Sequence, residues 1–337
     1  MKMTTKENVL ELFEKNKGVY FSGEELAGKL HVSRASVWRA VDGLRKEGYA
    51  IDAVTNKGYC LSEKGDILSA QGILKYLSEE YQKMNIRVAK ETESTNVVVR
   101  EYAEQGMEEG FLFVADEQTK GRGRYGRTFF SPQGTGVYFS LLLRPKGVLA
   151  RQGTGITAMA AVAMCEAVKE VSGRATGIKW VNDIYVDGRK VCGILTEASM
   201  GLESGTLDYV ILGVGVNVYS PENGFPESLA DKAGTVFDEV HDDMKNRLIA
   251  LFLEKFWAYY LKQGDKKYIK RYREYSLVTG KQIQVLAENG NREAYVLGID
   301  DDCRLLVEYQ DGERDVLSCG EISIAFTKNA NLVSKPD

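Results

Sequence analysis

Residues 121–127 read Gly-Arg-Gly-Arg-Tyr-Gly-Arg, and this run constrains the fold of the 337-residue chain more than any other segment. Its letters satisfy the G-x-G-x-x-G pattern of a dinucleotide fold, in which the glycines open a helix and an acidic residue follows roughly 20 positions later. Here residues 128–134 are typical of a turn and a strand, and the acidic position falls near Arg144. The sequence therefore excludes a dinucleotide-binding fold.

The same run favours a loop that binds an anion. Glycine lets backbone N–H groups approach a ligand closely, and the guanidinium groups of Arg122, Arg124 and Arg127 offer paired donors to phosphate or carboxylate. The alternative is a solvated basic loop or a nucleic-acid-binding RG segment, but RG tracts usually repeat, and this one occurs once. We therefore predict a flexible cationic loop that closes over an anionic ligand.

The length of the chain exceeds one ordinary core, so we expect two or three domains. The sequence contains no apolar run near the roughly 20 residues of a membrane span and no signal-peptide pattern at its start, which predicts a cytoplasmic protein without membrane contact. The five cysteines form no C-x-x-C pair, and the two histidines lie far apart. These counts favour reduced thiols and argue against a protein-built metal site or a histidine triad.

The first 62 residues predict three short helices and a hairpin, the pattern of a winged helix-turn-helix. Ser22 and Ser33 are placed to cap the second and third helices. The spacing of the third helix predicts an apolar stripe made of Val37, Trp38, Val41 and Leu44. Residues 49–61 then read as two brief strands around a turn.

This segment has the charge that a DNA-binding module needs. It carries ten Lys/Arg and eight Asp/Glu, whereas the whole chain has a net charge of −4. We predict that Arg34, Ser36 and Arg39 enter the major groove of DNA and that Lys57 meets a phosphate. A winged helix that serves only protein contacts remains the alternative.

The rest of the chain predicts an α+β multidomain fold with a central mixed β-sheet. We expect strands over 86–90, 111–117, 136–144, 177–186, 190–198 and 208–218 and helices over 69–80, 158–171, 241–262 and 266–276. After residue 276, short alternating strands indicate a small β-barrel. The expected domains are 1–64, 65–276 and 277–337.

Polar residues at strand and helix ends mark a second group of candidates in the central domain. Ser94, Thr95 and Asn96 precede a helix, where a plain N-cap is the alternative, and Gln118 ends the strand that enters the cationic loop. Residues 212–217 (Leu-Gly-Val-Gly-Val-Asn) end an apolar strand with glycines that permit close backbone approach.

Lys179 lies within the apolar stretch 177–186, which reads as one strand. Period-2 alternation then puts Lys179 and Asp183 on one face, with Trp180 and Asn182 on the other. A buried lysine is costly unless it meets an anion, so Lys179 is either a ligand-binding residue or a structural partner of Asp183.

Together these motifs resemble those of a biotin–protein ligase of the bifunctional kind, which is also the repressor of the biotin operon. The resemblance covers nearly the whole chain in order, and implies a winged helix, a class II synthetase-like ligase core and an SH3-like barrel. The motifs that carry it are Ser94-Thr95-Asn96, residues 117–127, Lys179-Trp-Val-Asn-Asp183, Gly193-Ile-Leu-Thr-Glu197, Gly213-Val-Gly-Val-Asn217 and Gly320-Glu-Ile-Ser323.

The resemblance implies a two-step reaction. Biotin and ATP, with Mg²⁺, would form biotinyl-5′-AMP, and the biotinyl group would then pass to one lysine of a biotin carboxyl carrier domain. The adenylate would also promote a homodimer that represses transcription from operator DNA. Three alternatives remain, namely a biotin-sensing repressor without ligation, a ligase that no longer binds DNA, and a lipoate ligase.

The resemblance also assigns roles to residues. Arg122, Arg124 and Lys179 would act at the reacting carboxylate and phosphate. The expected contacts of biotin and the nucleotide are Ser94, Thr95, Asn96, Gln118, Gly121, Arg122, Gly123, Arg124, Lys179, Gly193 and Asn217. Two departures from the family pattern are Phe129, where many relatives have tryptophan, and Val181, where proline is usual. Neither departure removes a charged group.

Overall fold

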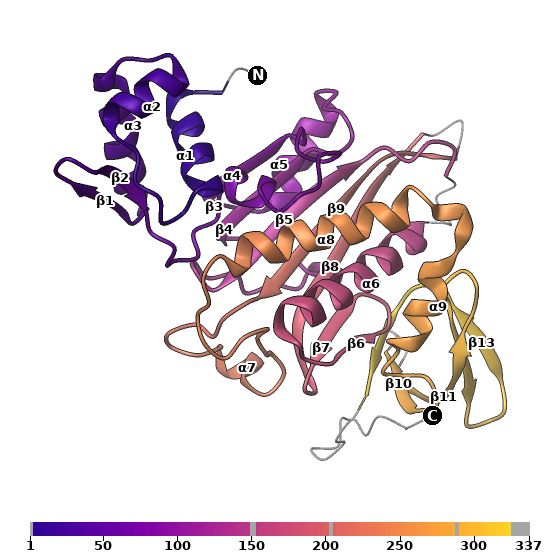
Figure 1. Ribbon diagram of the computed structural model, residues 1–337. Coiled ribbons are helices and arrows are strands. Elements are labelled where there is room, and N and C mark those ends of the chain that lie inside the picture. The colour runs from indigo at the N-terminus through magenta and orange to yellow at the C-terminus, as the bar shows by residue number, and fades with distance from the viewer. Residues whose placement is uncertain (1–2, 149–152, 202–204, 287–289, 325–337) are drawn as a thin grey trace, which may run out of the picture.

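The computed structural model describes residues 3–148, 153–201, 205–286 and 290–324. The winged helix-turn-helix forms as predicted at one corner of the molecule (Figure 1). The side chains of Thr4, Ser22 and Ser33 cap its three helices, because each side-chain oxygen accepts a hydrogen bond from a backbone N–H group. Its elements are α1 (Thr5–Lys15), α2 (Gly23–Leu30), α3 (Arg34–Lys46), β1 (Ile51–Val54) and β2 (Gly58–Leu61).

The predicted apolar stripe of α3 is wrong at Trp38. The residues of α3 that are buried are Val37, Ala40, Val41 and Leu44, whereas Trp38 is 58% exposed. From Val37, helical spacing of three, four and seven residues selects the other three buried positions, and Trp38 is turned about 100° away from Val37. The indole therefore lies on the outer surface of α3.

A buried cluster of charges joins the winged helix to the central domain. Lys75, which follows α4 (Ala70–Leu74), forms ion pairs with Glu14 of α1 at 2.7 Å and with Asp243. Lys17 also pairs with Asp243, at 3.3 Å.

The helix predicted over 69–80 is wrong in length, because the backbone N–H of Ser78 donates to the Glu254 carboxylate instead of continuing the helix.

The central domain contains a mixed sheet in the order β3-β4-β5-β9-β8-β7-β6. Only β3 and β4 are paired in parallel, while the other neighbours are antiparallel. The mixed sheet confirms the prediction for the core. The strands are β3 (Ile86–Thr92), β4 (Leu112–Gln118), β5 (Gly136–Leu143), β6 (Thr176–Lys179), β7 (Asp183–Val186), β8 (Arg189–Met200) and β9 (Leu207–Asn217).

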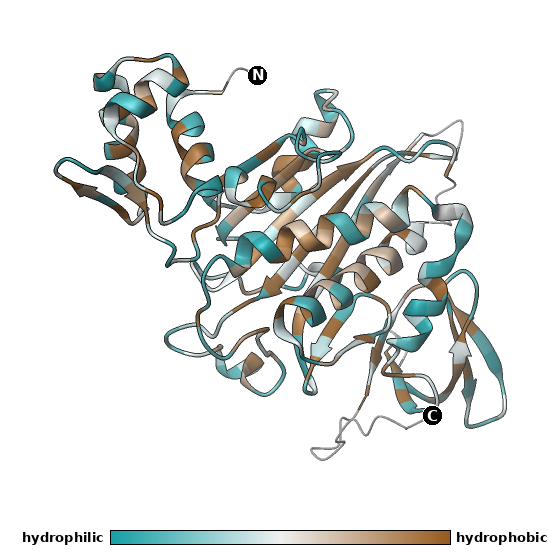
Figure 2. Cartoon of the chain, viewed as in Figure 1, coloured by the Kyte–Doolittle hydropathy of each residue, from teal (hydrophilic) through white to brown (hydrophobic). Residues whose placement is uncertain are grey.

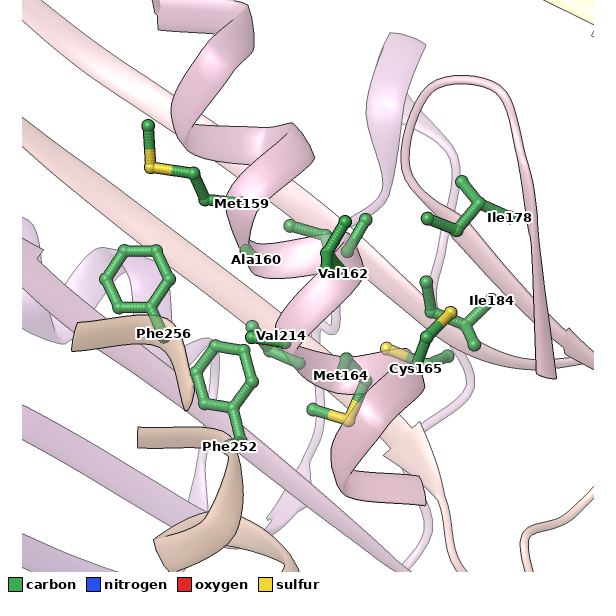
Figure 3. Close-up of a cluster of buried hydrophobic side chains, with 14 of the residues drawn as sticks. Met159, Ala160, Val162, Met164, Cys165, Ile178, Ile184, Val214, Phe252 and Phe256 are labelled. Atoms are coloured by element: carbon green, nitrogen blue, oxygen red, sulfur yellow. The ribbon is translucent and has the colours of Figure 1, made fainter. Parts of the chain in front are cut away.

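Helices cover both faces of this sheet. The long helices α6 (Gly153–Ser172) and α8 (Met244–Tyr260) lie side by side on one face, where Met159 and Met164 pack near Phe252 and Phe256 (Figures 1 and 3). The strands and the inward sides of these helices are predominantly hydrophobic (Figure 2). On the opposite face, α5 (Thr95–Glu104) packs on Leu142 and Ile211. We call this second side the α5 face.

The stretch 177–186 is a hairpin and not the single strand that was predicted. Strands β6 and β7 pair antiparallel around Trp180, Val181 and Asn182, and Lys179 lies directly opposite Asp183. The peptide bond between Trp180 and Val181 is cis. The single strand is wrong because residues 180–182 reverse the chain without a glycine or proline to mark the turn. Lys179 and Asp183 nevertheless lie on one face, as predicted, because directly opposed residues of an antiparallel pair point to the same side.

The C-terminal strands form the antiparallel sheet that a small β domain requires, in the order β13-β12-β11-β10-β14. The indole N–H of Trp180 donates to the Cys303 carbonyl at 3.0 Å and ties this sheet to the core. Residues 325–337 of the expected third domain lie outside the described residues. The remaining elements are η1 (Arg124–Gly126), α7 (Glu227–Ala230), η3 (Gln263–Asp265), α9 (Lys267–Glu274), β10 (Gln282–Leu286), β11 (Arg292–Ile299), β12 (Leu305–Tyr309), β13 (Arg314–Leu317) and β14 (Glu321–Ser323).

Candidate active site

A cavity of about 1540 Å³ opens on the α5 face of the central sheet. Its walls come from the N-terminal end of α5, the end of β4, the cationic loop, the β6–β7 hairpin and residues 320–324 of the C-terminal part. Ligand pockets for small molecules generally occupy about 300–1,000 Å³. This cavity therefore has room for a ligand of two linked parts.

Strand alternation makes the floor of the cavity out of glycines. On β9, Val214 and Val216 point into the core under α6, so Gly213 and Gly215 face the cavity. Gly193 of β8 lies directly opposite Gly215. The Phe129 ring rests on this pair, and a Cβ atom at Gly215 would lie 2.5 Å from that ring. Side chains at Gly193 and Gly215 would push the Phe129 ring, which itself lines the cavity, away from the floor.

The polar end of the cavity forms around the start of α5. Ser94 occupies the N-cap position, yet its side chain makes no capping hydrogen bond. Thr95 donates its backbone N–H to Gln118 Oε1 at 2.9 Å, and Gln118 Nε2 donates to Ser131 Oγ at 3.1 Å. Gln118 is thus held at the cavity wall, and the Ser94 hydroxyl is left for a ligand, which weakens the helix-cap interpretation.

Asn96 belongs to a buried network behind this wall. Its Nδ2 donates to Glu197 Oε2 at 2.6 Å, and the Ser140 hydroxyl lies 2.6 Å from Asn96 Oδ1 and 2.7 Å from Thr95 Oγ1. Glu197 also pairs with Arg100 at 2.7 Å. Ser140 was not predicted from the sequence, because one serine in an apolar strand is a common core residue. Asn96 therefore positions Thr95 through this network.

The cationic loop folds back on itself as a narrow turn. The Phe129 N–H donates to the Gly121 carbonyl at 2.9 Å, and the Gly123 N–H donates to the Arg127 carbonyl at 2.7 Å. A Cβ atom at Gly121 would lie 2.3 Å from the Phe129 carbonyl oxygen, so only glycine fits there. Tyr125 has a φ of 55°, in the left-handed region. The loop is therefore a defined structure above the cavity floor.

The three loop arginines have different surroundings. Arg124 donates to Asn182 Oδ1 at 3.3 Å and to the Gly320 carbonyl at 3.0 Å, while Arg127 pairs with Glu321. These two arginines connect the loop to the hairpin and the C-terminal sheet. Arg122 lines the cavity, and no residue of the described part of the chain forms an ion pair or hydrogen bond with its side chain.

Lys179 also reaches the cavity, and it has no partner among the residues that the structure describes. The Asp183 carboxylate forms its ion pair with Lys190, at 2.7 Å, and within the described ranges Lys179 has neither an ion pair nor a side-chain hydrogen bond. Burial lowers the pKa of the Lys179 ammonium, and the nearby Asp183 charge offsets this only in part. A bound anion would supply the missing charge. The structural pairing of Lys179 with Asp183 is therefore not the arrangement found.

Lys190 is a cavity residue that sequence reasoning missed. It follows the Asp187–Gly188 turn on β8 and lines the cavity. Its Nζ lies close above Gly193, 3.3 Å from where a Cβ atom would be if residue 193 had a side chain. A signal was available, because the tight turn brings Lys190 opposite Tyr185, two residues along the strand from Asp183, where its long side chain can pair with that carboxylate. Asn217, at the end of β9, was predicted; it lines the cavity and donates to the Gly234 carbonyl at 3.2 Å.

The candidate DNA-binding residues lie apart from this cavity, on the winged helix. Arg34 and Arg39 are exposed on α3. The Ser36 hydroxyl lies 2.9 Å from Ser33 Oγ, within the N-cap of α3. Lys57, in the turn between β1 and β2, lies over the Tyr20 ring at 5.7 Å. The structure thus divides the predicted residues into a ligand cavity and a separate basic surface.

Comparison with known proteins agrees with this division. Residues 88–217 match the biotin/lipoate A/B protein ligase family, residues 5–60 match a helix-turn-helix (HTH) domain, and residues 278–324 match the biotin protein ligase C-terminal domain. One relative is 35% identical over 94% of the chain. The chain belongs to the biotin/lipoate A/B protein ligase family, which confirms the resemblance found in the sequence.

That relative is the bifunctional ligase/repressor BirA of Bacillus subtilis, and the match covers 98% of its length. The bifunctional ligase/repressor BirA of Escherichia coli is 28% identical, with 91% of this chain and 94% of that protein covered. Among solved structures, the biotin protein ligase from Aquifex aeolicus in complex with biotin and ATP has a TM-score of 0.58 at 28% identity, and covers 71% of this chain and 97% of that one. The winged helix and the ligase core thus match bifunctional relatives over nearly their whole length.

Proposed function

We propose that this protein is a bifunctional biotin–protein ligase and transcriptional repressor. The observation that carries the ligase proposal is the pair of cations, Arg122 and Lys179, that face a glycine-floored cavity and have no ion-pair partner among the described residues. Similarity over nearly the full length to two bifunctional ligase/repressors supports both activities. The expected domains, 1–64, 65–276 and 277–337, divide these activities between a DNA-binding part and a catalytic part.

The first step brings together two anions, the biotin carboxylate and the α-phosphate of ATP. Arg122 and Lys179 would reduce the repulsion between them. A carboxylate oxygen of biotin attacks the α-phosphorus of ATP, and the bond from that phosphorus to the pyrophosphate oxygen breaks. Two unit charges about 4 Å apart near a protein surface interact by roughly 4 kcal/mol at an effective dielectric constant of about 20. Lys179 and Arg122 would offset this repulsion as the reacting groups meet. Arg124 would hold the loop in place and reach the phosphate.

The polar end of the cavity would hold the biotin ring. The Ser94 hydroxyl, Thr95 and Gln118 present donors and acceptors there, and the bond from Thr95 to Gln118 fixes their orientation. Gly121 and Gly123 would let the loop approach the biotin tail and the phosphate. The list of proposed binding residues is completed by Asn96, Gly193 and Asn217, the last beside the nucleotide.

Mg²⁺ would enter with ATP. The described residues contain no group of three or more His, Cys, Asp or Glu side chains able to hold a metal ion. Mg²⁺ is commonly bound through substrate phosphates with few protein ligands, so the donor set fits a metal carried by the nucleotide. Its charge would neutralise the phosphates while the chain positions the carboxylate.

In the second step, the amine of one lysine on a biotin carboxyl carrier domain would attack the acyl carbon of biotinyl-5′-AMP, and AMP would leave. The adenylate is a mixed anhydride, so it needs protection from water until the carrier arrives. The cationic loop provides that cover. No helix in the part of the chain that the structure describes is long and apolar enough to cross a membrane, and we propose a cytoplasmic location for both steps.

Biotin-dependent exchange between ATP and pyrophosphate tests the first step. We expect exchange with biotin and little with lipoate, which separates a biotin ligase from a lipoate ligase. Transfer to a carrier domain, detected by avidin blot, tests the second step. Absence of both reactions in a folded protein that binds biotin would refute the ligase and favour a sensor without ligation.

Repression would couple the two parts through a homodimer. Adenylate binding would order the loops and promote dimerisation, and a two-fold dimer would place two winged helices on operator DNA. Arg34, Ser36, Arg39 and Lys57 are the proposed DNA contacts. Sedimentation with and without biotin and ATP measures the coupling, and equal dimerisation in both states would refute it. A salt-dependent gel shift with DNA decides whether the winged helix binds DNA at all.

A further inference from the structure

Trp38 is the one tryptophan of the chain that the structure exposes to solvent. Its side chain is 58% exposed, whereas Trp180 and Trp257 are 4% and 6% exposed. An indole exposed to this extent gives up part of its burial energy, and tryptophan is enriched where a protein surface meets a partner. The position of Trp38 on α3 therefore needs an explanation outside the folded core.

The neighbours of Trp38 on α3 define a surface with positive charge. Arg34 lies one turn before Trp38, and Ala35 and Arg39 are also exposed. Arg45 is not available to a partner in the same way, because its guanidinium donates twice to the Ile51 carbonyl, at 2.9 and 2.6 Å. We call Arg34, Ala35, Trp38 and Arg39 the α3 surface.

The positive charge of the α3 surface favours a negatively charged partner. The segment 1–62 carries two more basic than acidic residues in a chain with a net charge of −4. The second helix of a helix-turn-helix enters the major groove with the residues of its first turns against base edges. Trp38 stands at the fifth position of α3, between two arginines that suit phosphates and guanines. Duplex DNA therefore fits this surface in both charge and geometry.

We infer that Trp38 determines sequence specificity by packing its indole on the C5-methyl group of a thymine in the major groove. That methyl is the apolar group that the major groove presents, and only A·T pairs carry it. The neighbouring Ala35 leaves room for the indole to lie flat. This inference rests on the proposed binding of DNA and adds that Trp38 recognises thymine.

Fluorescence gives a direct test, because Trp38 supplies the emission that iodide can reach. The full-length protein, with biotin and ATP, first selects duplexes from a random library. Iodide quenching is then measured with and without a selected duplex. We expect the duplex to reduce quenching several-fold in the wild-type protein and to change it little in Trp38→Phe, in which Trp180 and Trp257 remain buried.

Affinity measurements test the assignment to thymine. We expect Trp38→Ala to bind the selected duplex about tenfold more weakly, the size of one lost base contact, and unrelated duplexes within twofold of wild type. Replacing one thymine of the site by uracil, which lacks the methyl, should weaken the wild type by several-fold and leave Trp38→Ala unchanged. Val19→Ala, which removes another exposed apolar side chain, is the matched control.

Three outcomes distinguish the inference from the proposed function. If no thymine-to-uracil change separates wild type from Trp38→Ala, the reading of a methyl group is overturned. If Trp38→Ala weakens selected and unrelated duplexes equally, the side chain contributes no specificity and the inference fails while DNA binding stands. If the wild-type protein selects no duplex, the proposed DNA binding fails and this inference with it. A far-UV circular dichroism spectrum and a thermal unfolding curve of Trp38→Ala that match those of the wild type show that the variant is folded.

Discussion

Replacement of Lys179 by alanine tests the electrostatic basis of the proposed first step. The ammonium lines the cavity without an ion pair in the described structure, since Asp183 is engaged by Lys190 at 2.7 Å. Removal of Lys179 leaves the reacting carboxylate and phosphate with one fewer neighbouring cation. We expect adenylate formation to be lost while the protein still folds.

The size of the loss follows from the charge geometry. A cation about 4 Å from an anion contributes roughly 4 kcal/mol at an effective dielectric constant of about 20. Each 1.36 kcal/mol of activation free energy changes the rate about tenfold, so we expect Lys179→Ala to lower the exchange rate by roughly 10³-fold. Stability should not fall. Burial lowers the pKa of Lys179 in the folded state, so the folded state disfavours the charged form, and removing the lysine relieves that cost.

The assay is biotin-dependent ATP–pyrophosphate exchange, with thermal unfolding followed on the same samples. Lys120→Ala is the matched control, because Lys120 adjoins the loop, carries the same charge and forms an exposed pair with Glu93. We expect this control to keep nearly full activity. An exchange rate for Lys179→Ala within tenfold of wild type would refute the role given to Lys179.

Three further predictions concern the cavity floor, pH and the domain junction. Gly215→Ala should weaken biotin binding about tenfold in calorimetry, since its Cβ would lie 2.5 Å from the Phe129 ring. A bound anion raises the depressed pKa of Lys179, so biotin affinity should be full at low pH and fall as pH rises through the pKa of the bound state. Glu14→Gln should lower stability in urea unfolding by about 2–4 kcal/mol, because Lys75 loses a buried partner.

Each of these predictions has a matched control. Gly298→Ala places a methyl group on a strand where no atom lies within 4 Å, and it should leave biotin binding unchanged. Lys179→Arg keeps its charge at high pH, so its affinity should not fall with pH as the wild-type affinity does. Glu11→Gln removes only an exposed pair with Lys15 and should cost less than about 0.5 kcal/mol. Equal effects in variant and control would contradict the corresponding prediction.

The sequence predicted glycines that permit close approach at the end of an apolar strand, and the alternation of that strand explains why they form the cavity floor. In Gly213-Val-Gly-Val-Asn217, the valines pack under α6 and the glycines face the cavity, as period-2 alternation requires. The cationic loop was also predicted from its sequence, since glycines that alternate with arginines are typical of a backbone that binds an anion. Patterns of this kind are local, and a single strand or loop contains all the information that they need.

The failures have different physical origins, namely an unmarked turn, the angular position of one helix residue and one contact between distant residues. Lys179 and Asp183 were assigned to one strand, whereas they face each other across a hairpin whose turn has no glycine or proline. The stripe of α3 was assigned Trp38 because the residue is apolar, although its angular position points outward. Ser140 contacts Thr95 across 45 residues of sequence. The contact of Ser140 depends on how two elements pack, which no local pattern records, whereas helical spacing alone would have placed Trp38 outside.

The connection of the loop to the C-terminal sheet explains why residues 320–323 belong with the site motifs. Arg124 donates to the Gly320 carbonyl at 3.0 Å and Arg127 pairs with Glu321, so two of the three loop arginines are anchored by residues nearly 200 positions away. Arg122 forms no such contact within the described residues and faces the cavity. The loop can therefore close over the cavity only in a position that the C-terminal sheet sets, and that sheet acts as a wall of the active site.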